Sequence, residues 1–215
     1  GYTSAGKSTL MNMLAGTQLL ADAMPFATRD PTTRKIDLPN GYALFLTDTV
    51  GFIRNLPTQL VAAFHSTLEE VTFSDFIIHV VDLSNPSWEA QMDAVMDTLR
   101  VLEAEGKPMI TVFNKIDAVE DKHLVTRLVA EFPNSVAISA LTGEGMNDFN
   151  NALVKQVQEL LAPVRVLIPY DHQSLLQDCY DFGRVRKVEY QEDGIAVEAE
   201  LVSEMRHKLD PYRVS

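Results

Sequence analysis

Short apolar runs alternate with longer amphipathic segments over most of the chain. The runs 76–81 and 109–113 are almost continuously apolar, which is typical of parallel strands that are covered on both faces. A further strand is predicted over 135–138, and the segment 149–160 has the apolar spacing of a helix. This alternation predicts an α/β domain with a doubly wound, mostly parallel sheet that ends near Ala162.

The chain before the first apolar run predicts one helix and one hairpin. The helix covers 8–15, where leucine and methionine recur at helical spacing. The hairpin covers 35–47 and turns at Pro39-Asn40-Gly41, because an Asn-Gly pair supplies the positive φ angles that such turns require.

Three residues around the run 76–81 have specific expectations. Asn85 and Pro86 are predicted as the N-cap and the first position of a crossover helix. His79, within the apolar run, is predicted to be a core histidine whose hydrogen bonds are satisfied.

A second, smaller domain is predicted after Pro163, which we interpret as a break between the two domains. Strand, helix, strand, strand and helix are predicted over 164–168, 173–180, 184–190, 195–201 and 203–209. We therefore expect a doubly wound domain over 1–162 and a small α+β domain over 163–215.

Composition excludes some classes of function. The net charge of −12 argues against broad electrostatic binding to nucleic acid; the small basic cluster Arg184, Arg186 and Lys187 could still contact RNA or protein locally. No stretch approaches the roughly 20 apolar residues of a membrane span. Cys179 is the single cysteine, so no disulfide can form within the chain and a cytoplasmic location is expected.

The first eight residues, GYTSAGKS, match the spacing G-x-x-x-x-G-K-S of a phosphate-binding loop. Glycines let the backbone N–H groups of such a loop surround phosphate, a lysine neutralises it and a hydroxyl binds Mg²⁺. The predicted phosphate-binding residues are Gly1, Tyr2, Thr3, Ser4, Ala5, Gly6, Lys7 and Ser8.

Three further motifs, at 48–51, 114–117 and 139–141, each follow a predicted strand. The motif Asp48-Thr49-Val50-Gly51 places a carboxylate near Mg²⁺ and a glycine N–H near a γ-phosphate.

Asn114-Lys115-Ile116-Asp117 provides a carboxylate that can accept hydrogen bonds from the N1–H and exocyclic amine of guanine. Ser139-Ala140-Leu141 provides backbone N–H groups for the guanine carbonyl. All these motifs lie at the carboxyl ends of strands, where open α/β sheets bind ligands, and they predict a GTPase.

The segments GYTSAGKSTLMNML, PFATRDPTTR, DTVGFIRNLP, HSTLEEV, HVVDLSNP and NKID resemble the HflX family of ribosome-associated GTPases. The resemblance covers essentially the whole chain, because 164–209 is similar to the C-terminal domain of that family. It implies a P-loop GTPase domain whose first strand is missing here, so we expect the chain to begin inside a strand–loop junction of a longer protein.

The resemblance also implies further roles. The first switch would comprise Phe26, Ala27, Thr28, Arg29 and Asp30, with Thr28 beside Ser8 as a Mg²⁺ ligand. Thr32 and Thr33 are rival candidates for that ligand, and Arg29 stands where the family usually has leucine.

No catalytic residue is assigned from the sequence. Phe52 follows Gly51, where many GTPases have a glutamine that orients water. Slow hydrolysis that a partner accelerates is therefore expected.

The expected function is Mg²⁺-dependent hydrolysis of GTP, and the resemblance implies that it takes place on the large ribosomal subunit, in splitting or rescuing ribosomes. A GTPase of ribosome assembly or tRNA modification is one alternative. Another is an interaction module in which the nucleotide only sets the shape and is not hydrolysed.

Overall fold

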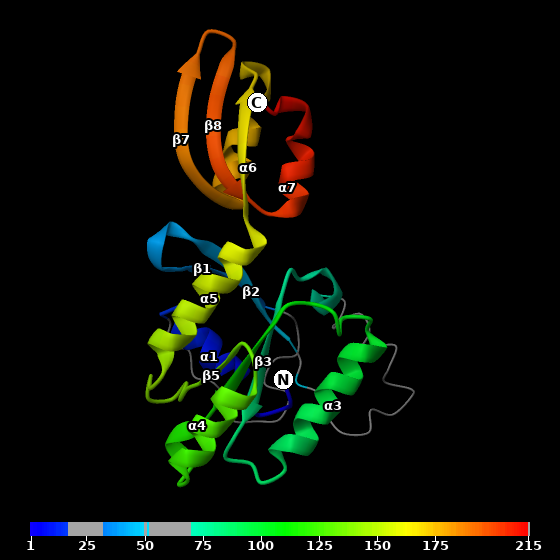
Figure 1. The fold of residues 1–215 in the computed structure, drawn as a ribbon, viewed down its shortest axis with the longest axis vertical. Coiled ribbons are helices and arrows are strands. Elements are labelled where there is room, and N and C mark those ends of the chain that lie inside the picture. Colours follow the sequence, from blue (N-terminus) through cyan, green and yellow to red (C-terminus); the bar gives the residue numbers. More distant parts are fainter. Residues whose placement is uncertain (17–31, 50, 52–69, 215) are drawn as a thin grey trace. The chain divides into compact units, whose positions relative to one another are not determined.

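A computed structural model describes residues 1–16, 32–49, 51 and 70–214 (Figure 1). The chain separates into two compact units. Unit 1 comprises Gly1–Ile36 and Phe45–Leu153, and unit 2 comprises Asp37–Leu44 and Val154–Ser215. The predicted domain boundary after Ala162 stays a prediction.

Unit 1 contains a parallel sheet in the order β3-β4-β5. Its strands are β3 (Ile77–Asp82), β4 (Met109–Asn114) and β5 (Ser135–Ala137), with Asp82 in register with Asn114. The strands β1 (Thr32–Asp37) and β2 (Ala43–Asp48) form a separate two-stranded sheet. The parallel sheet and its helical crossovers confirm the predicted α/β class.

Four helices accompany these strands: α1 (Lys7–Leu14), α3 (Trp88–Val101), α4 (Lys122–Glu131) and α5 (Met146–Leu160). The ring of Phe113 on β4 has edge-to-face contacts with Trp88, at 6.2 Å between centroids, and with Phe132, at 5.5 Å. The start of α3 and the end of α4 therefore share one core cluster. Phe149 and Leu153 of α5 are fully buried.

The prediction that Asn85 caps the crossover helix is wrong. Helix α3 begins at Trp88, and the Asn85 Oδ1 atom accepts a hydrogen bond from the Ser87 N–H at 2.9 Å. Asn85 therefore stabilises a turn before the helix, which asparagine can do by binding the backbone two residues further along.

His79 is buried in β3, but its Nδ1 atom has no hydrogen-bond partner in the described part of the chain. The prediction that the hydrogen bonds of His79 are satisfied is therefore wrong for its Nδ1 atom. The pKa of His79 is lowered to about 3, chiefly because burial disfavours the charged imidazolium.

Unit 2 contains the antiparallel sheet β6-β8-β7. The predicted order of elements is confirmed: β6 (Ala162–Ile168), α6 (Ser174–Asp181), β7 (Gly183–Gln191), β8 (Gly194–Leu201) and α7 (Ser203–Lys208). Alternate residues of β8 join residues of both helices in one core. Burial raises the pKa of Cys179 in this core to about 11, which agrees with a packing role.

Pro163 lies inside β6, opposite Glu200 of β8, and not before the strand as expected. Strand β6 is at an edge of the sheet, where a residue without an N–H group is tolerated.

Short 3-10 helices complete the described elements: η1 (Pro39–Gly41), η2 (Ile116–Ala118), η3 (Tyr170–His172) and η4 (Asp210–Tyr212). The predicted hairpin is present, with η1 as its turn and Gly41 at a φ of 76°. Within the described residues, no helix is long and apolar enough to cross a membrane.

The tip of this hairpin belongs to unit 2 and contains a buried tyrosine. The Tyr42 hydroxyl accepts hydrogen bonds from Gln158 Nε2 at 3.3 Å and Arg184 Nη1 at 3.2 Å, and donates to Glu200 Oε2 at 3.4 Å. The Arg184 guanidinium also lies 5.0 Å from the centre of the Tyr42 ring, a cation–π arrangement. We call these four residues the Tyr42 cluster.

Candidate nucleotide-binding site

The glycine-rich loop leads directly into the N-terminus of α1. Ser4 has a φ of 60° and Gly6 a φ of 93°, so the backbone curls tightly before Lys7 begins the helix. A Cβ atom at Gly6 would collide with the amide nitrogen of Asn114. Gly6 is therefore required both by its backbone angle and by its neighbour, and the loop presents a helix N-terminus suited to an anion.

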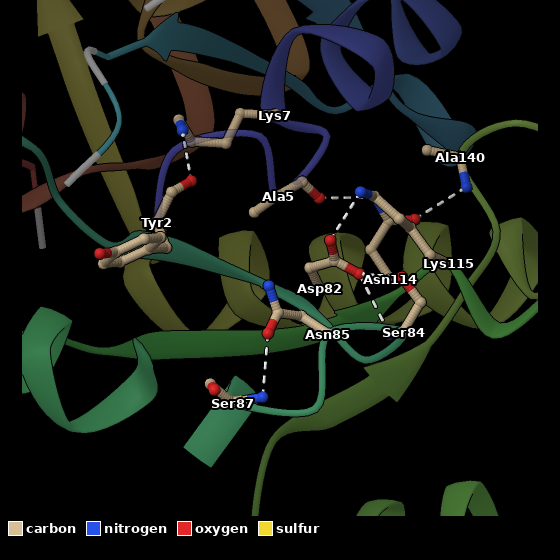
Figure 2. A network of polar contacts seen from close by, with 10 residues as sticks. All are labelled: Tyr2, Ala5, Lys7, Asp82, Ser84, Asn85, Ser87, Asn114, Lys115 and Ala140. Atoms are coloured by element: carbon tan, nitrogen blue, oxygen red, sulfur yellow. Dashed lines mark hydrogen bonds and ion pairs between the residues drawn. The ribbon is translucent and has the colours of Figure 1, made fainter. Parts of the chain in front are cut away.

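Lys7 folds back over this loop. Its Nζ atom donates to the Tyr2 backbone oxygen at 3.0 Å (Figure 2). Burial lowers the pKa of Lys7, and the negative charge of Asp48 opposes that shift. A buried ammonium gains most from an additional anion, which is the chemistry expected of a phosphate site.

Gly51 lies close to the same loop. A Cβ atom there would be 2.6 Å from the Thr3 Cα atom and 2.9 Å from Lys7 Nζ. Only a residue without a side chain fits at this distance, so the structure brings the second motif against the first.

Ser8 and Asp48 meet at the end of β2, where the Ser8 hydroxyl donates to Asp48 Oδ2 at 2.6 Å. Asp48 is buried. A hydroxyl and a carboxylate are hard oxygen donors of the kind that Mg²⁺ prefers, so these two side chains fit the predicted metal.

Asn114 joins three of the predicted motifs through its side chain. Its Nδ2 atom donates to the Ala5 backbone oxygen at 2.9 Å, and its Oδ1 atom accepts from the Ala140 N–H at 3.0 Å (Figure 2). Asn114 is 2% exposed. It therefore fixes the loops at 1–8 and 139–141 relative to the end of β4.

The loop at 139–141 uses two of its N–H groups internally. The Ser139 N–H donates to the Glu144 oxygen at 2.9 Å, and the Ala140 N–H donates to Asn114. Leu141 is exposed. Which N–H group would meet a guanine carbonyl stays a prediction.

The turn after β4 carries Lys115 and Asp117. Lys115 has a φ of 66°, and its Nζ atom forms an ion pair with Asp82 Oδ2 at 2.6 Å (Figure 2). Asp117 lies within η2 and is exposed, and the structure gives its carboxylate no partner among the described residues. That carboxylate is accordingly available to a ligand.

Sequence reasoning did not identify Asp82 as part of this site. A signal for it existed, because Asp82 is a polar residue directly after an apolar strand, as Asp48 and Asn114 are. The sequence did identify Lys115 as part of a motif, but the spacing of motifs could not reveal its ion pair with Asp82, 33 positions earlier.

Several predicted residues lie outside the described residues: Phe26, Ala27, Thr28, Arg29, Asp30, Val50 and Phe52. Of the rival metal ligands, Thr33 has a hydroxyl 2.8 Å from the Thr47 hydroxyl within the hairpin. Thr32 begins β1 and is exposed.

The phosphate-type loop contacts both the carboxylate at the end of β2 and the Asn-Lys-x-Asp turn at the carboxyl end of the parallel strand β4. This fold and arrangement define a P-loop domain of the GTPase class. Comparison with known proteins agrees: the family model described as "50S ribosome-binding GTPase" matches residues 1–115, and the model "HflX C-terminal domain" matches residues 124–212.

The chain belongs to the HflX family of GTPases. A "GTPase HflX" of Lacrimispora saccharolytica is 48% identical over 205 residues, which cover 95% of this chain and 48% of that protein. A "GTPase HflX" of Akkermansia muciniphila is 44% identical, over 99% of this chain and 49% of that protein. The chain thus spans about half the length of these relatives.

A solved structure supports the fold. Era of Aquifex aeolicus, a Y63A variant bound to GDP and AlF4⁻, superposes with a TM-score of 0.58 over 89% of this chain and 72% of that one. The identity of 17% makes this a likeness of fold alone.

Proposed function

We propose that the protein binds and hydrolyses GTP with Mg²⁺, and that it acts on the large ribosomal subunit in splitting or rescuing ribosomes. The observation that carries the nucleotide part is the Asn114 side chain, which joins the phosphate-type loop to the loop at 139–141. The ribosomal part is supported by family membership.

The phosphate end of the nucleotide would lie on the loop at 1–8. Backbone N–H groups at the start of α1 bind phosphate oxygens, and Lys7 supplies the positive charge. Ser8 and Thr28 would hold Mg²⁺, with Asp48 acting through water, and the ion when bound neutralises charge that develops on the phosphate oxygens. Thr49, Val50 and Gly51 would lie against the γ-phosphate.

The base end would lie at the turn after β4 and the loop at 139–141. Asp117 accepts hydrogen bonds from the guanine edge, and the exposed Leu141 offers an apolar surface on the loop at 139–141. Residues 1–162 would form the catalytic domain and 163–215 a separate C-terminal domain.

Nucleotide binding is tested by titrating full-length protein with fluorescent GTP, GDP and ATP. Tight binding of both guanine nucleotides with weak binding of ATP is expected. Equal affinity for ATP and GTP would contradict the assignment of the base site.

Hydrolysis and the ribosomal partner need a separate experiment. Phosphate release by the full-length protein should be slow alone, since Phe52 cannot orient water, and should accelerate with purified large subunits. Binding without multiple-turnover release, with or without subunits, would favour a non-hydrolysing module. Co-sedimentation with subunit precursors in preference to mature subunits would favour a role in assembly.

A further inference from the structure

Asp82 lies beside the predicted guanine-binding turn but outside the four motifs. We propose that Asp82 is a positioning residue that holds the turn carrying Asp117 and thereby sets guanine affinity and selectivity. This inference rests on the proposed function, because it concerns the same base site.

Both oxygens of the Asp82 carboxylate have fixed partners. Oδ1 accepts from the Ser84 N–H at 3.1 Å and from the Ser84 hydroxyl at 2.6 Å, and Oδ2 pairs with Lys115 at 2.6 Å. The Asp82 side chain is only 13% exposed. The loop after β3 therefore holds the carboxylate in one orientation, as Figure 2 shows.

Lys115 needs such a partner because of its backbone. Its left-handed φ of 66° is unfavourable for a residue with a side chain, and such conformations persist only where the surroundings fix them. The chain around it is tied on both sides: the Leu83 N–H donates to the Asn114 oxygen at 3.0 Å, and the Ile116 N–H donates to the Ile138 oxygen at 3.2 Å.

Lys115 is thus the link between a fixed strand end and the 3-10 turn that contains Asp117. The ion pair with Asp82 holds the Lys115 side chain against the end of β3. Without the carboxylate, the Lys115 side chain gains rotamer freedom and the backbone loses one of its constraints. The exposed Asp117 carboxylate would then be less well placed to meet a base.

The pairing also separates the roles of the two lysines of the site. The Lys115 ammonium is neutralised by Asp82, whereas Lys7 lies at the phosphate loop beside Tyr2. Loss of Asp82 should therefore affect recognition of the base and leave discrimination between di- and triphosphate unchanged.

The test is Asp82→Asn in the full-length protein, which keeps the shape and the bonds to Ser84 but removes the charge. Dissociation constants for GTP, GDP and ITP are measured by nucleotide titration. We expect GTP and GDP to weaken by about tenfold each, since the amide nitrogen that replaces Oδ2 cannot accept from the Lys115 ammonium and the ion pair is lost. ITP, which lacks the exocyclic amine, should weaken less, so the preference for GTP over ITP falls.

The matched control is Asp97→Asn, which removes a comparable ion pair at 2.7 Å to Arg100 on the surface of α3. Asp97 is 72% exposed, and all nucleotide affinities should be unchanged. Lys115→Met supplies a second check: adding Asp82→Asn to it should cause little further loss, because the partner is already absent.

An unchanged GTP affinity and GTP-to-ITP ratio in Asp82→Asn, with wild type binding normally, would overturn the inference. Equal weakening of GTP and ITP in Asp82→Asn, with the same factor again in the Lys115→Met background, would also overturn it by indicating a general structural effect. Failure of the wild type to bind guanine nucleotide would contradict the proposed function itself.

Discussion

Two networks of hydrogen bonds join parts of this chain that are distant in sequence. They differ in whether polar groups remain available to bind a ligand. The network around Asn114 connects residues up to 109 positions apart. The loops that it joins belong to a site with the exposed carboxylate of Asp117 and the partly buried ammonium of Lys7. The Tyr42 cluster connects residues up to 158 positions apart, and the Tyr42 hydroxyl makes three hydrogen bonds within the protein. A network with capacity left for a ligand indicates a binding site, whereas a satisfied one indicates structural support.

Replacing Asp117 should have the largest effect within the first network. Asp117→Asn is expected to shift preference from guanine to xanthine nucleotides, because an amide can donate to the xanthine carbonyl where guanine has an amine. Discrimination by buried polar groups at a base edge can reach ~10⁴. Competition titration of GTP against XTP measures the shift, and a ratio equal to that of the wild type would show that Asp117 does not bind the base.

Replacing Lys7 should have the next largest effect. Lys7→Ala in the full-length protein removes the ammonium that lies at the phosphate loop, and roughly hundredfold weaker GTP binding is expected from losing a charge-assisted contact to phosphate. Asp97→Asn again serves as the neutral control. An unchanged dissociation constant would mean that the loop does not hold phosphate.

The second network should respond in stability and not in affinity. Tyr42→Phe leaves polar groups of Gln158, Arg184 and Glu200 with one partner fewer, which should lower the free energy of unfolding by about 1–3 kcal/mol. Denaturant unfolding of the full-length protein measures this.

Tyr170→Phe is the matched control for Tyr42→Phe. Its hydroxyl donates to the Gln191 oxygen at 2.7 Å in an exposed position, so a loss below about 1 kcal/mol is expected. Equal losses in the two variants would contradict the supporting role of the Tyr42 cluster.

The smallest effect is expected at the exposed margin of that cluster. Arg186 pairs with Glu200 at 2.5 Å but its side chain is 57% exposed, so Arg186→Gln should change stability by less than about 1 kcal/mol. Co-sedimentation with large subunits should be measured on the same variant. Weaker co-sedimentation at unchanged stability would assign the basic cluster to the ribosome.

The elements and the motifs could be predicted because their signals are local. Strands β3 and β4 are short apolar runs, the order of elements in unit 2 follows from alternation and turn residues, and the phosphate-type loop has fixed spacing. Asn85 shows the limit of such reasoning, since one asparagine suits both a helix cap and a turn, and the contacts of its neighbours decide between them.

The pairings could not be predicted, because they depend on which strand ends the fold brings together. Asp82 and Lys115 meet only because β3 and β4 are parallel neighbours in register. Tyr42 resembled an ordinary strand residue, and its three partners lie more than 100 positions later in the sequence.

The position of Tyr42 in the chain also has a consequence for synthesis. Glu200 emerges 158 residues after Tyr42, which at translation rates of about 5–20 residues per second is a delay of roughly 8 to 30 s. Gln158 and Arg184 emerge 116 and 142 residues after Tyr42, so over the first 116 residues of that interval the Tyr42 hydroxyl has none of its later partners and can be satisfied only by water or by temporary contacts. The hairpin therefore reaches its final surroundings well after its own strands have been made.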